Sequence, residues 1–200
     1  QQMEEVYERK PFALAGTALA SVCFLLACLA PNDALDENIS LEDNNVGSDG
    51  LSKLNFNSAS PNLVFESQSG SMTLNLGDGN DTVNLLGSDA LFSQALRIRG
   101  ERGVDTIVAT DFMHAVTLSG GGGMDNLRGG PGDDLILGGS GRDRMHGRGG
   151  KDSMLGGPGN DELYGGRDND FLSGGGEPDT LNGGPGRDKL TGESGGDLLA

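Results

Sequence analysis

The clearest pattern in this chain is an aliphatic side chain that recurs every nine positions from residue 120 onward. Each nine-residue unit begins with glycine and carries Asp at its sixth place and an aliphatic residue or Met at its eighth. Side chains of a strand alternate between its two faces. The last three places of a unit therefore predict a short strand whose middle side chain points inward. The glycine-rich residues before them predict a tight turn.

Nine such units run from 120 to 200 without insertion or deletion. Their eighth places predict the core: Leu127, Ile136, Met145, Met154, Leu163, Leu172, Leu181, Leu190 and Leu199. Their sixth places are Asp125, Asp134, Asp143, Asp152, Asp161, Asp170, Asp179, Asp188 and Asp197. A disordered acidic tail would not keep an aliphatic residue in phase with an aspartate in this way. Two units complete one coil, so each turn should stack on the turn two units later.

Weaker alternation precedes the array, over 71–76, 82–85, 96–99, 106–110 and 115–118. Two turns there, within 76–84 and 100–108, keep a Gly, an Asp two residues on and an aliphatic residue two after that. We therefore expect 54–119 to form longer, degenerate coils of the same superhelix. A separate small β-domain is the alternative.

The N-terminal part predicts export. Arg9 and Lys10 precede an uncharged apolar run, 12–30, as in a secretory signal. Residues 25–28 resemble a bacterial lipobox, in which Cys28 would be lipidated and tether the protein to a membrane. Ordinary cleavage and an uncleaved membrane anchor are the alternatives. Residues 1–30 are thus a predicted signal or anchor, and 31–53 a predicted acidic, disordered linker.

The amino-acid composition limits the kinds of partner that the protein can bind. Glycine supplies 36 residues, but not at every third position as collagen requires. The net charge of −16 argues against nucleic acid and favours a cation. Aspartate offers the anionic oxygen that calcium prefers, and backbone carbonyls can complete its coordination. The sequence contains no EF-hand loop flanked by helices.

The array resembles the RTX (repeats-in-toxin), or hemolysin-type, calcium-binding repeats, whose consensus is Gly-Gly-x-Gly-x-Asp-x-aliphatic-x. The resemblance implies an all-β fold, a right-handed parallel β-roll, with one calcium ion shared by the aspartates of two stacked turns. It pairs Asp125 with Asp143, Asp134 with Asp152, Asp143 with Asp161, Asp152 with Asp170, Asp161 with Asp179, Asp170 with Asp188 and Asp179 with Asp197. That arrangement gives at most seven full sites.

Glycines at the second and fourth places complete the predicted calcium sites through their backbone: Gly121, Gly123, Gly130, Gly132, Gly139, Gly141, Gly157, Gly159, Gly184 and Gly186. Four residues depart from glycine at these places, namely Arg148, Asp168, Glu177 and Glu193. Turns that contain them are expected either to be distorted or to gain a further carboxylate.

No catalytic motif stands out. The sequence around His114 shows no metal-ligand spacing, and His146 occupies a variable ninth place. Arg142, Arg144, Arg148 and Lys151 are expected to balance surface charge rather than bind an anion. We expect a non-enzymatic, exported protein that folds on binding calcium and serves a structural or adhesive role outside the cell or at its surface. The alternative is the calcium-binding portion of an RTX enzyme (a protease, lipase or epimerase) or toxin, with its catalytic part outside this chain.

Overall fold

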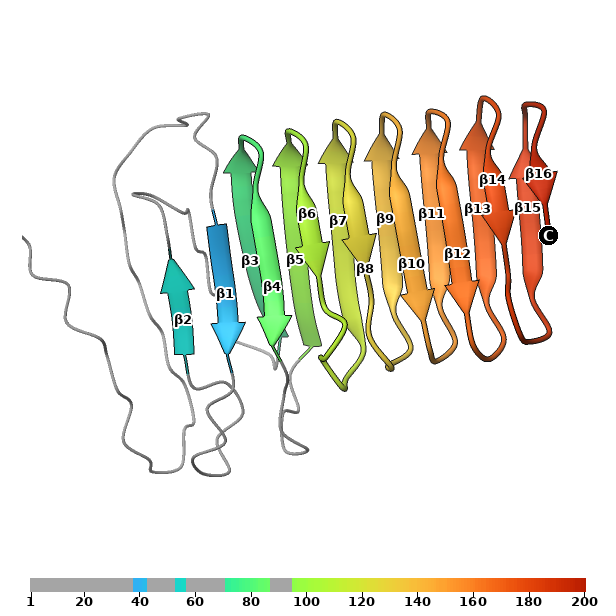
Figure 1. Cartoon of the computed structure of the whole chain (residues 1–200). Helices are drawn as coiled ribbons and strands as arrows, with labels where there is room; N and C mark the ends of the chain where they lie inside the picture. Colours follow the sequence, from blue (N-terminus) through green and yellow to red (C-terminus); the bar gives the residue numbers. More distant parts are fainter. Residues whose placement is uncertain (1–37, 43–52, 57–70, 87–94) are drawn as a thin grey trace, which may run out of the picture.

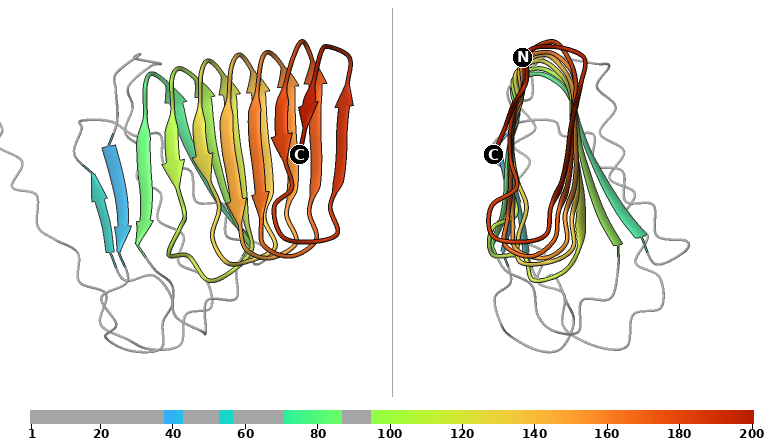
Figure 2. Two further views of the ribbon diagram at one scale, coloured as in Figure 1. Left: turned by 45° about the vertical axis from the view of Figure 1, so that its right-hand side comes forward. Right: turned by 90° about the vertical axis from the view of Figure 1, so that its right-hand side faces the viewer.

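Two parallel sheets face each other across a flattened solenoid in the computed structural model (Figure 1), which describes residues 38–42, 53–56, 71–86 and 95–200. The chain alternates between the sheets. Seen along the solenoid axis, the coils of the array nearly superimpose, whereas the green upstream strands diverge from them (Figure 2). Within the described ranges every regular element is a strand, and no helix there could cross a membrane.

Sheet A has nine strands, in the order β16-β14-β12-β10-β8-β6-β4-β1-β2. They are β1 (Asn38–Glu42), β2 (Lys53–Phe56), β4 (Thr82–Leu86), β6 (Thr106–Val108), β8 (Asn126–Arg128), β10 (Arg144–Arg148), β12 (Glu162–Gly166), β14 (Thr180–Asn182) and β16 (Leu198–Leu199).

Sheet B has seven strands, in the order β15-β13-β11-β9-β7-β5-β3. They are β3 (Ser71–Asp78), β5 (Ala95–Arg102), β7 (Val116–Gly122), β9 (Leu135–Ser140), β11 (Ser153–Pro158), β13 (Phe171–Gly176) and β15 (Lys189–Glu193).

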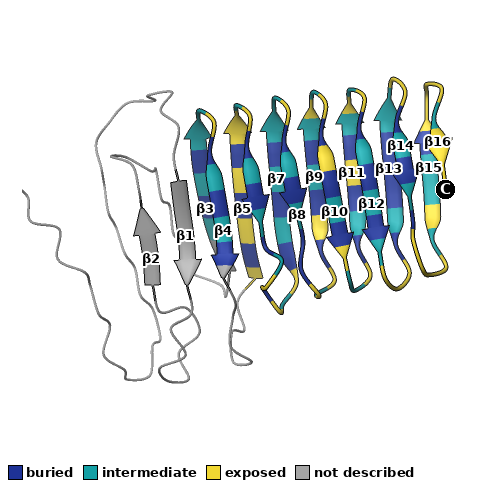
Figure 3. Ribbon diagram, in the orientation of Figure 1, coloured by how far each residue is buried: buried dark blue, intermediate teal, exposed yellow. Residues whose placement is uncertain are grey.

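The register confirms a coil of two nonapeptides. Leu135 of β9 lies beside Ser153 of β11, and Arg144 of β10 lies beside Glu162 of β12, so each residue pairs with its equivalent two units later. In the short strands β6, β8 and β14 the middle residue is buried and its two neighbours are less so, an alternation that the burial colours follow along the ribbon (Figure 3). The eighth-place residues from Leu127 to Leu181 are fully buried, whereas Leu190 is partly buried and Leu199 is 49% exposed in the last coil.

The region before the array continues both sheets. Strands β3, β5 and β7 pair in parallel and lead directly into β9, while β4 and β6 lead into β8. The described residues 71–86 and 95–119 therefore form coils of the same solenoid, as expected, and not a separate β-domain. These coils are longer than two nonapeptides, because Ser71 pairs with Ala95 and Leu96 pairs with Val116.

The predicted linker differs from the structure at 38–42. There β1 pairs in parallel with β4, and β2 pairs antiparallel with β1 at the end of sheet A. The sequence NISLE alternates apolar and polar residues, which suits a strand added to an open sheet edge. The predicted signal at 1–30, with Cys28, lies outside the described residues.

Candidate metal-binding edges

Two rows of tight turns join the sheets, one along each edge of the solenoid (Figure 1). The row that we call the first edge consists of turns 76–81, 100–105, 120–125, 138–143, 156–161, 174–179 and 192–197. The second edge is formed by turns 129–134, 147–152, 165–170 and 183–188, preceded by the irregular segment 109–115. Each nonapeptide thus supplies one turn and the strand after it, and successive units alternate between the edges.

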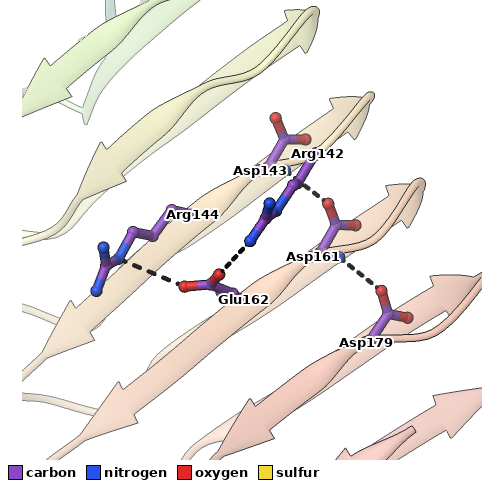
Figure 4. A network of polar contacts seen from close by, with 6 residues as sticks. All are labelled: Arg142, Asp143, Arg144, Asp161, Glu162 and Asp179. Carbon is purple, nitrogen blue, oxygen red and sulfur yellow. Dashed lines mark hydrogen bonds and ion pairs between the residues drawn. The ribbon is translucent and has the colours of Figure 1, made fainter. Parts of the chain in front are cut away.

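The sixth-place aspartates of each edge form a hydrogen-bonded row (Figure 4). The backbone N–H of each aspartate donates to Oδ1 of the aspartate one coil later, at 2.8–3.0 Å between nitrogen and oxygen. All seven expected pairs are therefore stacked neighbours, from Asp125 with Asp143 to Asp179 with Asp197. These bonds fix one carboxylate oxygen of each pair between two turns.

The second carboxylate oxygen, Oδ2, is buried without a hydrogen-bond partner in most turns. The aspartates concerned are 1–3% exposed. The partnerless Oδ2 atoms include those of Asp105, Asp125, Asp143, Asp152, Asp161, Asp170 and Asp179. A buried, unsatisfied carboxylate oxygen is costly, so its recurrence in successive coils points to a cation as the missing partner.

Glycine makes room for this oxygen. A Cβ added to Gly156 would lie 2.4 Å from Oδ2 of Asp161 and 2.5 Å from the carbonyl oxygen of Gly174 in the next coil. A Cβ added to Gly159 would lie 1.7 Å from the carbonyl oxygen of Gly141. Carboxylate and carbonyl oxygens thus converge between stacked turns, and a Cβ at Gly156 or Gly159 would collide with them. Such an all-oxygen, flexible set suits calcium.

The electrostatics point the same way. Burial raises the pKa of Asp125, Asp152 and Asp161 to about 7 and that of Asp134 to about 6, with neighbouring carboxylates adding to the rise. Burial likewise raises the pKa of Asp105, Asp143, Asp170 and Asp179. Without a cation, the ionised form of these carboxyl groups is unfavourable at neutral pH. A divalent cation would relieve both desolvation and mutual repulsion.

Backbone oxygens must supply much of the coordination, because no three His, Cys, Asp or Glu side chains converge on one point within the described ranges. The turn conformation that aims the carbonyls inward needs positive φ. Seven of the predicted glycines have it: Gly121, Gly123, Gly139, Gly141, Gly157, Gly159 and Gly184.

Gly130 and Gly132 depart from the expected turn conformation, since neither has a positive φ. Their turn stacks on the irregular segment 109–115: added Cβ atoms would meet the carbonyl oxygen of Phe112 and the backbone of His114. The N–H of Gly130 instead donates to Oδ2 of Asp134 at 2.8 Å. Gly186, also without positive φ, stacks on the carbonyl of Asp168.

The four residues that replace glycine keep the glycine conformation. Arg148, Asp168, Glu177 and Glu193 all have φ between 65° and 88°. Their turns therefore retain the backbone path, at a cost of about 1–2 kcal/mol each for left-handed backbone. Glu177 also adds a carboxylate, whose Oε2 accepts the N–H of Gly159 at 3.0 Å.

Two aspartates before the array, Asp81 and Asp105, lie in the same row and were not among the predicted site residues. The N–H of Asp81 donates to Asp105 Oδ1, and the N–H of Asp105 donates to Asp125 Oδ1, each at 2.8 Å. The Gly-x-Asp-x-aliphatic signature was visible at both positions. The longer spacing between these aspartates, which is not a multiple of nine, hid them from a strict nonapeptide search.

Two of the basic side chains pair with one glutamate of the neighbouring coil. Arg142 contacts Glu162 at 2.7 Å and Arg144 contacts it at 3.7 Å (Figure 4). His146 stacks on Tyr164, with ring centroids 4.7 Å apart, where β10 pairs with β12. Arg142 and Arg144 thus balance the charge of Glu162, as expected.

Comparison with known proteins agrees with this geometry. A family model of the RTX calcium-binding nonapeptide repeat, which spans four copies, matches residues 119–154, 146–181 and 164–199. No curated protein matches the chain. The matches begin where the regular register of two nonapeptides per coil begins, and they cover both rows of turns. Residues 119–199 of this protein are therefore RTX calcium-binding nonapeptide repeats, stacked as a parallel β-solenoid.

Proposed function

We propose that this protein is exported, folds on binding calcium and acts without catalysis as a structural or adhesive module outside the cell or at its surface. One calcium ion is held between each stacked pair of turns. The aspartates of the pair and the carbonyl oxygens of the turn glycines provide its ligands. The observation that carries the proposal is the row of buried Oδ2 atoms without hydrogen-bond partners.

Calcium dependence follows from the thin interior of the array. The array contains 27 of the 36 glycines, and each costs about 0.5–1 kcal/mol of backbone entropy relative to Ala. Each strand from β8 to β14 offsets this with one buried aliphatic or Met side chain, worth about 1.5–3 kcal/mol. Repulsion between stacked carboxylates opposes folding, so the metal-free array should be close to unfolded.

Export fits this calcium dependence. Weak sites fill where calcium is abundant, as outside cells, and stay empty in a low-calcium cytoplasm. The array would then cross a membrane unfolded and fold on arrival. The charged flank and apolar run at 9–30 support an export signal.

Circular dichroism of the full chain tests calcium-driven folding. Adding millimolar calcium to metal-stripped protein should raise the β-sheet signal and reduce the hydrodynamic radius. Magnesium, at the same concentration, should act poorly because it demands small octahedral sites. Identical spectra with and without calcium would refute the proposal.

Mass spectrometry of the membrane fraction from a bacterial host tests the tether. Acylated Cys28 at the mature N-terminus is the expected result. A mature chain that begins after Cys28 would refute lipidation and leave ordinary secretion. Protein confined to the cytoplasm would refute export itself.

A further inference from the structure

We propose that the calcium row of the first edge extends one coil upstream of the nonapeptides, to a site between turns 100–105 and 120–125 whose added carboxylate is Asp105. The proposal rests on the calcium sites proposed for the array. It assigns a metal site to a turn that the matched repeats, 119–199, do not include. The turn reads GERGVD and departs from the repeat consensus at its second place.

Asp105 stacks as the array aspartates do. Its backbone N–H donates to Oδ1 of Asp125 at 2.8 Å, and its own Oδ1 accepts the N–H of Asp81 at 2.8 Å. Asp105 is 1% exposed, and its Oδ2 is buried without a hydrogen-bond partner. Like Asp143 in the array, it has one carboxylate oxygen held by a hydrogen bond and a second that is buried without a hydrogen-bond partner.

The cradle around that oxygen also matches the array. A Cβ added to Gly100 would lie 2.1 Å from Oδ2 of Asp105 and 2.5 Å from the carbonyl oxygen of Gly120. The corresponding distances from a Cβ on Gly138 are 2.5 Å to Asp143 and 2.7 Å to Gly156. The space between turns 100–105 and 120–125 is therefore shaped by the same atoms.

Glu101 replaces the consensus glycine at the second place of the turn, yet its backbone carbonyl keeps the position that a glycine carbonyl has in the array. Glu101 has φ of 77°, and a Cβ added to Gly121 would lie 2.1 Å from its carbonyl oxygen. Inside the array, a Cβ on Gly139 would lie 2.0 Å from the carbonyl oxygen of Gly121. Glu101 thus reproduces the glycine backbone and adds a negative charge to the turn.

The proposed calcium row ends at the coil of Asp105 on the first edge and at the coil of Asp134 on the second edge. The next turn upstream begins with Leu76 in the place of Gly100, as the pairing of Gly77 with Glu101 shows. A side chain in that place takes the space that Oδ2 occupies downstream. On the second edge Val116 stands where Asp134 stands one coil later, and its N–H donates to Asp134 Oδ1 at 2.9 Å. The first edge alone therefore gains a site.

Native mass spectrometry of the full chain at saturating calcium tests the proposal. Asp105→Asn keeps the shape and the Oδ1 acceptor but removes the charge, so it should bind one calcium ion fewer than the wild type. Asp111→Asn is the matched control, because it removes one charge at an exposed position of the same coils. This control should keep the full count.

Hydrogen exchange localises the effect. Calcium should slow exchange in peptides spanning 100–108 of the wild type and do so far less in Asp105→Asn. Gly100→Ala, which fills the cradle, should also lose one ion. An unchanged count in Asp105→Asn would overturn the upstream site and leave the array sites standing. A loss of several ions would overturn it too, because Asp105 would then support the array as a whole. Absence of calcium binding by the wild type would sink the proposed function itself.

Discussion

The coils before the array, described at 71–86 and 95–119, and the array itself at 120–200 build the same two sheets, yet they fill the interior in different ways. Strand β5 buries Leu96 and Ile98, and β7 buries Val116 and Leu118. Strands β8 to β14 of the array bury one apolar side chain each, such as Ile136 in β9. The upstream coils therefore bury about twice as much apolar surface per strand, which favours their folding without a metal.

At one register position of the coil, an apolar side chain upstream is exchanged for an aspartate in the array. On the second edge the same register position holds Leu96, then Val116, then Asp134 and the aspartates that follow it. An apolar side chain upstream is replaced by a buried carboxylate in the array. This solenoid therefore holds its coils together in two ways, by a hydrophobic interior and by a bound cation. We expect the upstream coils to be the template on which calcium folds the array.

Lowering the pH should have the largest effect, because several buried carboxyls act together. In the metal-free fold the pKa values of Asp125, Asp152 and Asp161 are raised to about 7, above the value of an unfolded chain. The folded state then binds more protons, so its stability is greatest in acid and is lost as the pH rises through about 7. Metal-stripped protein should gain β-structure by circular dichroism between pH 8 and pH 5.

Calcium competes with those protons, so its apparent affinity should fall over the same range. Metal-free spectra that do not change between the two pH values would contradict the view that buried carboxylates keep the array unfolded.

Core truncations should separate the two regions. Ile98→Ala should lower the free energy of unfolding of the metal-free upstream coils by about 2–5 kcal/mol, since Ile98 is fully buried. Met154→Ala, equally buried in the array, should leave that metal-free transition unchanged and destabilise only the calcium-loaded protein. Urea titrations followed by circular dichroism, with and without calcium, measure both. A metal-free transition that both variants shift equally would mean that the two regions fold as one unit.

Within the array, an interior aspartate should matter more than one in the last coil. Asp161 stacks with both Asp143 and Asp179, whereas Asp197 stacks with Asp179 alone. At calcium ten times its dissociation constant, each site contributes about 1.4 kcal/mol. Asp161→Ala should therefore cost about 3 kcal/mol and two ions, and Asp197→Ala about half of that. Equal losses in calorimetric calcium titrations would show that stacked turns do not share ions.

A glycine pair tests the cradle at smaller cost. Gly156→Ala places a Cβ against Asp161 Oδ2 and should destabilise the calcium-loaded protein by about 1–3 kcal/mol. A Cβ on Gly176 meets nothing within 4 Å and its φ is not positive, so Gly176→Ala should be neutral or stabilising by up to about 1 kcal/mol. Thermal unfolding in calcium compares them. If Gly156→Ala were as stable as Gly176→Ala, the space between the turns would not be a tight metal cradle.

Sequence periodicity predicted most of this fold because each nonapeptide repeats one local structure. It gave the strands, the inward residues from Leu127 to Leu181 and the stacked aspartate pairs. It missed Asp105 because extra residues upstream lengthen the coil between Asp105 and Asp125. It assigned the standard turn to Gly130 and Gly132, whose conformation is set by the segment below them rather than by their own repeat. Contacts between coils of unequal length cannot be read from a local pattern.

Hydrogen exchange of the full chain, resolved by peptide and compared in calcium and in metal-stripped buffer at neutral pH, tests the central claim most directly. Peptides from 120–200 should be strongly protected in calcium and exchange rapidly without it. Peptides from 71–86 and 95–99, before the proposed Asp105 site, should stay protected in both buffers. Equal protection of the array with and without calcium would contradict the account, because the array would then fold around its buried aspartates without a cation.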